Sequence, residues 1–168
     1  INKENIRNKN ILFIHTGGIP LIFTHAEAFE RKLEWMNILL CSAGRRVKIV
    51  QYLKESLNKK GGIVVTADCD SKAPALYFGD KKELIPRIDS QDYLNEVIRI
   101  CKKHNIRGVI SLIDPELETL AKNKELFDEI GVSLVLSPFK MVQYCFDKQE
   151  TYNYLNAINI PAVPTYSE

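Results

Sequence analysis

The sequence predicts an α/β protein: an open parallel sheet of about four to five strands with helices on both faces. Short apolar runs alternate with longer amphipathic segments from residue 37 onward, an order of strand and helix that is typical of such sheets. The apolar runs show little polar alternation, as expected for strands covered on both faces. The strands should therefore be joined by right-handed helical crossovers.

The first unit of this pattern is the stretch 36–50. Three consecutive apolar residues, Ile38 to Leu40, predict a buried strand over 37–41. A tight turn follows at 42–44, where Gly44 lets the backbone bend sharply and approach a ligand, and a helix is expected to start near Arg45. The unpaired amides at the start of that helix, together with Arg45 and Arg46, could hold an anion.

An ordinary strand-to-helix connection with two solvated arginines explains the same stretch equally well. A dinucleotide-binding fingerprint needs three spaced glycines, and this turn has one.

The remaining elements continue the alternation. Further strands are expected at 63–67, 83–85, 108–113 and 132–136. Helices or helical turns are expected at 73–78, after a cap at Asp89 or Ser90, from Pro115 to 130 with a break, from Ser137, and from Asp147, whose helix should turn Tyr152, Leu155 and Ile158 inward. Ahead of this alternating region, residues 10–15 suggest a strand and Pro20 opens an apolar helix, so residues 1–35 form a separate strand–helix appendage.

Three polar turns follow the predicted strands, at 42–46, 68–70 and 114–116. Because the carboxyl ends of parallel strands meet at one edge of a sheet, we expect these turns to converge there and to bind a ligand. The candidate substrate-binding residues are Ser42, Gly44, Arg45, Arg46, Asp68, Asp70, Asp114 and Glu116. Two arginines facing several carboxylates would suit a zwitterion such as an amino acid. The alternative is that Asp68 and Asp114 are helix caps and turn formers.

Composition narrows the function classes. The 23 basic and 21 acidic side chains of the 168 residues nearly balance, and no basic cluster is interleaved with aromatics, so no nucleic-acid partner is expected. The four cysteines show no spacing typical of a metal site, and no apolar run is long enough to span a membrane. We therefore expect a cytoplasmic protein with no metal ligands of its own.

Residues 36–168 resemble the N-terminal, pre-ATP-grasp domain of ATP-grasp enzymes, in particular the group called carbamoyl-phosphate-synthase-like. The resemblance rests on four ordered motifs: Ser-Ala-Gly-Arg-Arg at 42–46, Asp-Cys-Asp followed by Ala-Pro-Ala-Leu-Tyr at 68–77, Ser-Leu-Ile-Asp-Pro-Glu-Leu at 111–117, and Asp-Lys-x-x-Thr at 147–151. It implies a Rossmann-like domain that supplies part of the substrate site of a carboxylate–amine ligase.

The resemblance also implies that the complete ligase uses ATP and magnesium and forms an acyl phosphate. Lys148 matches a basic residue that reaches the ATP phosphates in several members, although a solvent-facing helix lysine would look the same. These 168 residues contain no glycine-rich phosphate loop and no acidic magnesium ligands of the central ATP-binding domain. We therefore expect the chain alone to have no catalytic residues, to bind no cofactor tightly and to be inactive.

Residues 1–35 resemble the C-terminal tail of the pyridoxal-phosphate-dependent D-cysteine desulfhydrase and aminocyclopropane-carboxylate deaminase group. The shared features are a strand, the His-Thr-Gly-Gly turn at 15–18 and an apolar helix, with Thr16 matching the residue that meets the pyridine nitrogen. Met36 then looks like a fresh start, which suggests a fusion. No pyridoxal chemistry is expected, because the lysine that forms the Schiff base has no match here.

Three rival functions stay open from the sequence. The chain could be a free-standing Rossmann-like module that binds a nucleotide or amino acid and regulates a partner. It could be a fragment of a pyridoxal enzyme. It could also self-associate through a face near Tyr144, Phe146 and Pro161.

Overall fold

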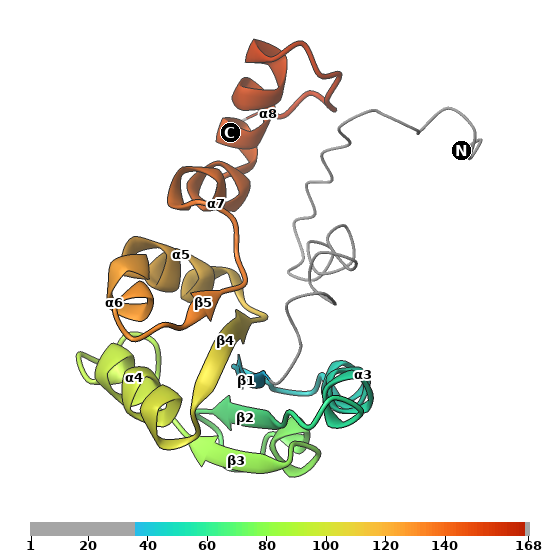
Figure 1. The fold of residues 1–168 in the computed structure, drawn as a ribbon. Helices are drawn as coiled ribbons and strands as arrows, with labels where there is room; N and C mark the ends of the chain where they lie inside the picture. The colour runs from blue at the N-terminus through green and yellow to red at the C-terminus, as the bar shows by residue number, and fades with distance from the viewer. Residues whose placement is uncertain (1–35, 167–168) are drawn as a thin grey trace.

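A computed structural model describes residues 36–166, which form one open sheet with helices on both of its faces (Figure 1). All five strands are parallel and lie in the order β3-β2-β1-β4-β5. They span β1 Asn37–Cys41, β2 Val64–Asp68, β3 Lys81–Leu84, β4 Ile106–Ser111 and β5 Ser133–Leu134. The predicted fold class is therefore confirmed, and β1, the first strand along the chain, is the central strand of the sheet.

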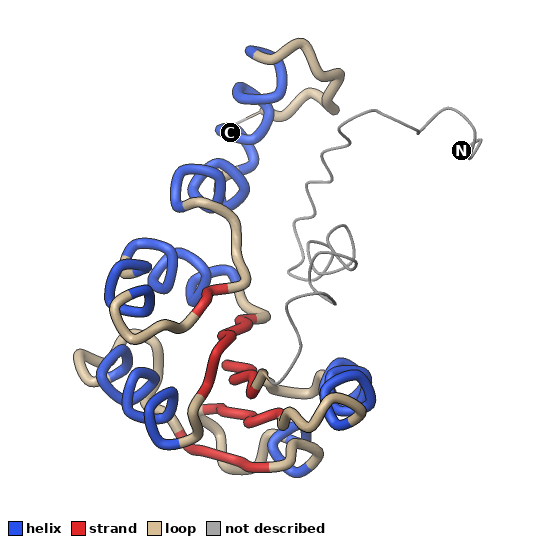
Figure 2. Tube along the Cα trace, in the orientation of Figure 1, coloured by secondary structure: helices blue, strands red, loops and turns tan. Residues whose placement is uncertain are grey.

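Each strand is followed along the chain by a helix or a helical turn (Figure 2). They are α3 Val47–Asn58, the 3-10 turn η2 Pro74–Tyr77, α4 Tyr93–Lys103, α5 Asp114–Lys122, α6 Lys124–Asp128, α7 Phe139–Phe146 and α8 Lys148–Ala157. Helix α3 begins slightly later than the sequence predicts, at Val47, because residues 42–46 are all used by the turn. The break predicted after Pro115 separates α5 from α6.

The sheet divides the core into two halves because successive side chains of a strand point to opposite faces. On one face Ile38 and Leu40 of β1 pack with Val50, Leu53 and Leu57 of α3. On the other face the core contains Leu39 and Cys41 of β1, with Tyr93, Val97 and Ile100 of α4 and with Leu120 and Phe127. All four of these β1 side chains are completely buried, and each fully buried Leu or Ile stabilises the fold by about 1.5–3 kcal/mol.

Two glycines end α3 and bring the chain back to the sheet. Gly61 has a φ of 77°, the left-handed conformation that commonly stops a helix. At Gly62 a Cβ atom would lie 2.2 Å from the carbonyl oxygen of Met36, so only glycine fits between α3 and the start of β1.

Helices α7 and α8 extend away from the sheet, as the orange and red ribbon in Figure 1 shows. Helix α7 packs on α5, and α8 packs on α7, where the rings of Tyr144 and Tyr154 stack with centroids 4.6 Å apart. Asp147 caps α8 as predicted, since its Oδ1 accepts the amides of Gln149 and Glu150.

The predicted inward face of α8 is wrong in part. No residue of α8 is buried, Tyr152 and Leu155 are half-buried, and Ile158 is exposed. The reason is that α8 rests on a single helix rather than on the sheet, so it has no second surface against which to bury a stripe.

Three sequence predictions concern residues 1–35. The predicted strand at 10–15, the helix from Pro20 and the role of Thr16 all lie outside the described residues.

Within residues 36–166, none of the helices combines the length and the apolar character that crossing a membrane requires.

Candidate functional site

The turns that follow β1, β2 and β4 are joined by hydrogen bonds at one edge of the sheet. The amide of Gly44 donates to Asp68 Oδ2 at 2.7 Å, which links the first turn to the second. The hydroxyl of Ser42 donates to Glu116 Oε1 at 2.9 Å, which links the first turn to the third. The predicted convergence is therefore confirmed. It lies where β2 and β4 leave β1 on opposite sides, the switch point at which such sheets bind ligands.

The turn itself has an unusual backbone. Ser42 and Gly44 both have positive φ angles, 45° and 55°, and a left-handed serine is uncommon. Neighbouring elements hold the turn in place: the Ala43 amide donates to Ala67 at 3.1 Å, and Gly44 accepts the amide of Ala75 at 3.0 Å. The Arg46 guanidinium also reaches back to the Ser42 carbonyl at 3.4 Å. These bonds from β2 and η2 fix a conformation that the short sequence alone would not favour.

Asp68 is a structural residue of this edge. It is 8% exposed, and its two carboxylate oxygens accept different amides, Oδ2 that of Gly44 and Oδ1 that of Asp70 at 2.9 Å. The contacts of Asp68 are thus those of a turn-forming residue, the alternative given for it from the sequence. Asp114, by contrast, is not a helix cap, because Ile113 occupies that position and α5 has no side-chain cap.

Glu116 lies beneath the turn and is completely buried. Its Oε1 accepts the hydroxyls of Ser42 and Tyr93, and its Oε2 accepts the hydroxyl of Ser111 at 2.5 Å. Burial raises the pKa of the Glu116 carboxyl above its ordinary value, and the nearby charge of Asp68 adds to this, although the three hydroxyl donors oppose it. Both oxygens of the enclosed Glu116 carboxyl are therefore bonded to protein hydroxyls.

Sequence reasoning missed Tyr93 and Ser111 as members of this cluster. Burial raises the pKa of the Tyr93 phenol strongly, and burial beside Glu116 raises the pKa of the Cys41 thiol, so both stay protonated. Ser111 could have been recognised as the polar residue that closes an apolar strand. Tyr93 gave a weaker signal, because it is a large ring with a polar tip at the start of a helix.

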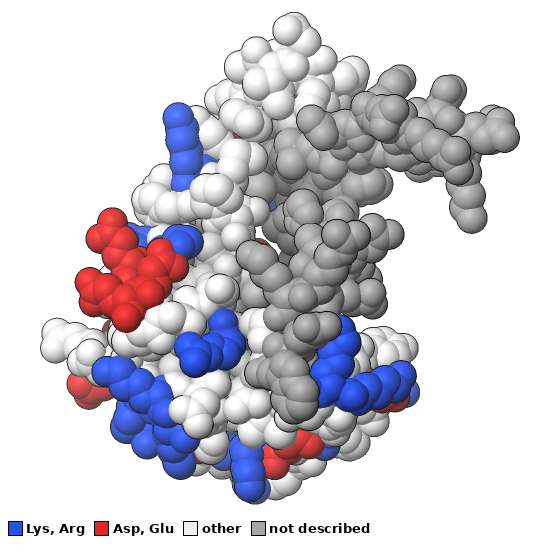
Figure 3. All heavy atoms as spheres, viewed as in Figure 1, with Lys and Arg blue, Asp and Glu red and all other residues white. Residues whose placement is uncertain are grey.

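Several charged groups remain open to solvent at this edge. Arg45, Asp70 and Asp114 are exposed, and Arg46 is half-buried. These two arginines and two carboxylates on neighbouring turns supply charges of both signs, which suit a zwitterion. Within the described part of the chain, no group of three His, Cys, Asp or Glu side chains could hold a metal ion. On the face drawn in Figure 3 the acidic side chains gather mainly in one patch at the left, and the basic side chains form several separate groups.

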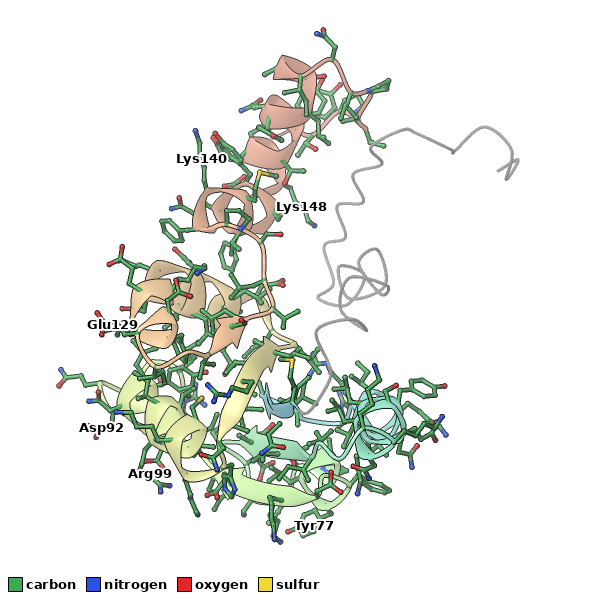
Figure 4. All side chains as sticks on the ribbon, viewed as in Figure 1. Tyr77, Asp92, Arg99, Glu129, Lys140 and Lys148 are labelled. Carbon is green, nitrogen blue, oxygen red and sulfur yellow. The ribbon has the colours of Figure 1, made fainter. Side chains whose placement is uncertain are left out.

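Lys148 stands apart from these turns. It is exposed at the first position of α8 and projects from the α7–α8 pair beyond the sheet (Figure 4). The structure therefore brings together Ser42, Gly44, Asp68 and Glu116 by direct contacts, while Lys148 belongs to a second region.

Comparison with known families gives one match. A family model described as "PylC-like, N-terminal domain" matches residues 38–135, which include β1 to β5 and the three turns. No curated protein matches the chain significantly.

Solved structures with the same fold belong to larger proteins. The complete multifunctional pyruvate carboxylase from Rhizobium etli is 16% identical with a TM-score of 0.54, over 78% of this chain and 13% of that one. The biotin carboxylase subunit of pyruvate carboxylase is 15% identical with a TM-score of 0.56, over 77% and 29%. The L-amino acid ligase from Bacillus licheniformis is 17% identical with a TM-score of 0.54, over 75% and 31%. This chain thus spans less than a third of the length of each, and the likeness is one of fold.

Proposed function

The chain belongs to the family of PylC-like N-terminal domains, and we propose that it is the substrate-side domain of an ATP-grasp ligase that joins a carboxylate to an amine. The single observation that carries this proposal is the hydrogen-bonded meeting of the turns after β1, β2 and β4 at the switch point of the sheet. The resemblance of residues 36–168 to pre-ATP-grasp domains of the carbamoyl-phosphate-synthase-like group supports it.

The residues of the turns divide into two kinds. Asp68 and Glu116 hold the first turn in place, and Arg45, Arg46, Asp70 and Asp114 provide the charges that face a substrate. Arginine suits a carboxylate because its planar guanidinium can donate two parallel hydrogen bonds. Asp70 and Asp114 can accept from an ammonium group. We assign these residues to binding and orienting an amino acid or a similar small molecule, and none of them to a catalytic step.

Magnesium-bound ATP, when present in the complete ligase, supplies the phosphoryl group that activates the carboxylate as an acyl phosphate. Among the described residues Lys148 could neutralise part of the phosphate charge, since its ammonium group is exposed on a flexible stem. The amides of Gln149 and Glu150 beside it are already bound by Asp147. The residues described here fit a contribution to phosphate binding and not a magnesium site. We therefore assign the metal to other residues of the ligase, and the 168 residues alone are expected not to turn over ATP.

Amide chemical shifts of the isotopically labelled chain would test the substrate site. We would titrate each of the twenty L-amino acids into the millimolar range and follow the amides of Gly44, Arg45 and Arg46. At least one amino acid should shift these signals, and Arg45→Ala should abolish the shift. Arg87→Ala is the matched control, because Arg87 is an exposed arginine in the loop between β3 and α4.

Two results would overturn the proposal. The first is the absence of any Arg45-dependent shift with all twenty amino acids. The second is sustained ATP hydrolysis by the 168-residue chain. Tight binding of Mg-ATP that disappears in Arg45→Ala would instead favour the free-standing nucleotide-binding module.

A further inference from the structure

Among residues 36–166, no cationic side chain forms a hydrogen bond or ion pair with the buried Glu116 carboxyl. Its bonded partners are three hydroxyls, from Ser42 at the end of β1, Ser111 at the end of β4 and Tyr93 at the start of α4. Glu116 itself lies in the first turn of α5. One carboxyl group therefore joins four elements of the fold at a single point.

Burying a carboxyl group without a cation costs free energy, which here is offset only through hydrogen bonds. An apolar side chain at this buried place would avoid that cost. An apolar side chain could not accept a hydrogen bond from the Ser42 hydroxyl. This serine has the left-handed φ of 45° that the turn requires and that a serine does not favour.

We propose that Glu116 is a positioning residue for the substrate site, whose carboxyl fixes the Ser42–Arg46 turn against the first turn of α5. The geometry of the contacts supports this role. The Ser42 bond holds the start of the arginine-bearing turn, and two positions before Glu116 the exposed Asp114 begins α5. Glu116 thereby sets the spacing between the cationic turn and the acidic turn. The ligand that these turns bind is taken from the proposed function. The way in which Glu116 holds the turns is independent of that function.

Hydrogen exchange of backbone amides in the ligand-free chain tests the positioning. Glu116→Met keeps the side-chain volume and removes the acceptor, and Ser42→Ala removes the donor. Both should accelerate exchange of the Ala43 and Gly44 amides about tenfold relative to Leu39, since each loses the same hydrogen bond. Glu116→Gln keeps an oxygen that accepts from Ser42 and should leave the exchange of these amides unchanged.

Tyr93→Phe is the control for a general packing effect. It removes another hydroxyl from the same carboxyl group without touching the turn, so it should lower global stability and spare the Ala43 and Gly44 amides. The proposal is overturned if Ser42→Ala accelerates these amides no more than Tyr93→Phe does. The comparison of Ser42→Ala with Tyr93→Phe tests the positioning role even if Glu116→Met does not fold.

Binding adds a second readout, with the L-amino acid that gives the largest Arg45-dependent shift as the probe. Ser42→Ala and Glu116→Met should each weaken its affinity about tenfold, and Glu116→Gln should not. Faster exchange with unchanged amino-acid affinity would overturn the positioning role. If no amino acid binds the unaltered chain, the proposed function fails, whereas the exchange comparison still shows whether Glu116 holds the turn.

Discussion

The backbone amide of Gly44 donates to Asp68 Oδ2 at 2.7 Å, across 24 positions of the sequence. The same carboxylate accepts the Asp70 amide through Oδ1, so the last residue of β2 holds both its own turn and the turn of the neighbouring strand. Two charge-assisted bonds thus depend on one nearly buried side chain.

Asp68→Ala should therefore destabilise the chain. Both amides lose their charged acceptor, and a hydrogen bond to a charged group contributes about 1.5–3 kcal/mol. Urea unfolding followed by circular dichroism would measure the change in the free energy of unfolding. Asp70→Ala, which removes an exposed carboxylate, should cost less than half as much, and equal losses for the two variants would contradict this assignment.

Glu116 should make stability depend on pH in a direction opposite to that of most carboxylates. Its pKa is raised in the folded chain, so folding favours the protonated form. Stability from this group is greatest below the ordinary carboxyl pKa and decreases as pH rises through the raised value. Glu116→Gln cannot ionise, so its free energy of unfolding should improve relative to the unaltered chain as pH increases from about 4 to 8.

Glu83 offers a control of the opposite sign for this pH series. Burial alone would raise the pKa of the Glu83 carboxyl. The Lys103 and His104 side chains, at 2.7 and 2.6 Å, outweigh burial and hold that pKa below its ordinary value. Its contribution is present above the ordinary pKa and is lost as pH falls. Glu83→Gln should therefore become less stable relative to the unaltered chain as pH rises, and curves of the same slope for both variants would contradict the two assignments.

Gly62→Ala should be strongly destabilising. Its Cβ would lie 2.2 Å from the Met36 carbonyl oxygen, and a backbone atom cannot move aside without shifting β1. We expect a loss of about 1–3 kcal/mol, the usual cost of overpacking. Thermal unfolding would measure it. Gly108→Ala in β4 is the matched control, because its Cβ would meet no atom nearer than the flexible Met36 Cε at 3.4 Å. A similar loss there would argue against the steric explanation.

Asp147→Ala should loosen α8 without unfolding the sheet. The side chain caps the helix by accepting the Gln149 and Glu150 amides, and loss of such a cap costs about 1 kcal/mol. Since α8 has no buried residue, the effect should stay local. Amide exchange should accelerate in residues 149–157 and remain unchanged in β1. Equal acceleration in both regions would show that α8 supports the sheet more than its contacts suggest.

Much of the fold could be predicted from the sequence because buried strands consist of recognisable runs of apolar residues. β1, β2 and β4 are covered on both faces, so their apolar runs carry the signal directly. β3 gave a weaker signal, since Lys81 and Lys82 lie on an exposed edge strand where no core selects apolar residues. The meeting of the three turns followed from parallel topology alone.

The burial and the hydrogen-bond partners of residues in the candidate site could not be predicted in the same way. Glu116 stood among the residues expected to face a substrate, yet it is completely enclosed. Its environment is made by Ser42, Tyr93 and Ser111. Ser42 and Tyr93 lie 74 and 23 positions away in the sequence, and a local sequence pattern carries no information about such distant neighbours. The same limit applies to α8, whose stripe of apolar residues does not reveal that its neighbour is a lone helix.

The central position of β1 has a consequence for how the chain acquires its structure. Leu39 pairs with Val65 on one side and with Val109 on the other, so the second edge of this apolar strand stays open until β4 has been synthesised. During translation, a half-formed sheet of β1, β2 and β3 would expose that edge to other nascent chains. Pairing between such distant segments is also slow. Chaperone dependence and aggregation during expression should therefore respond most to substitutions in β4, the strand that closes the sheet.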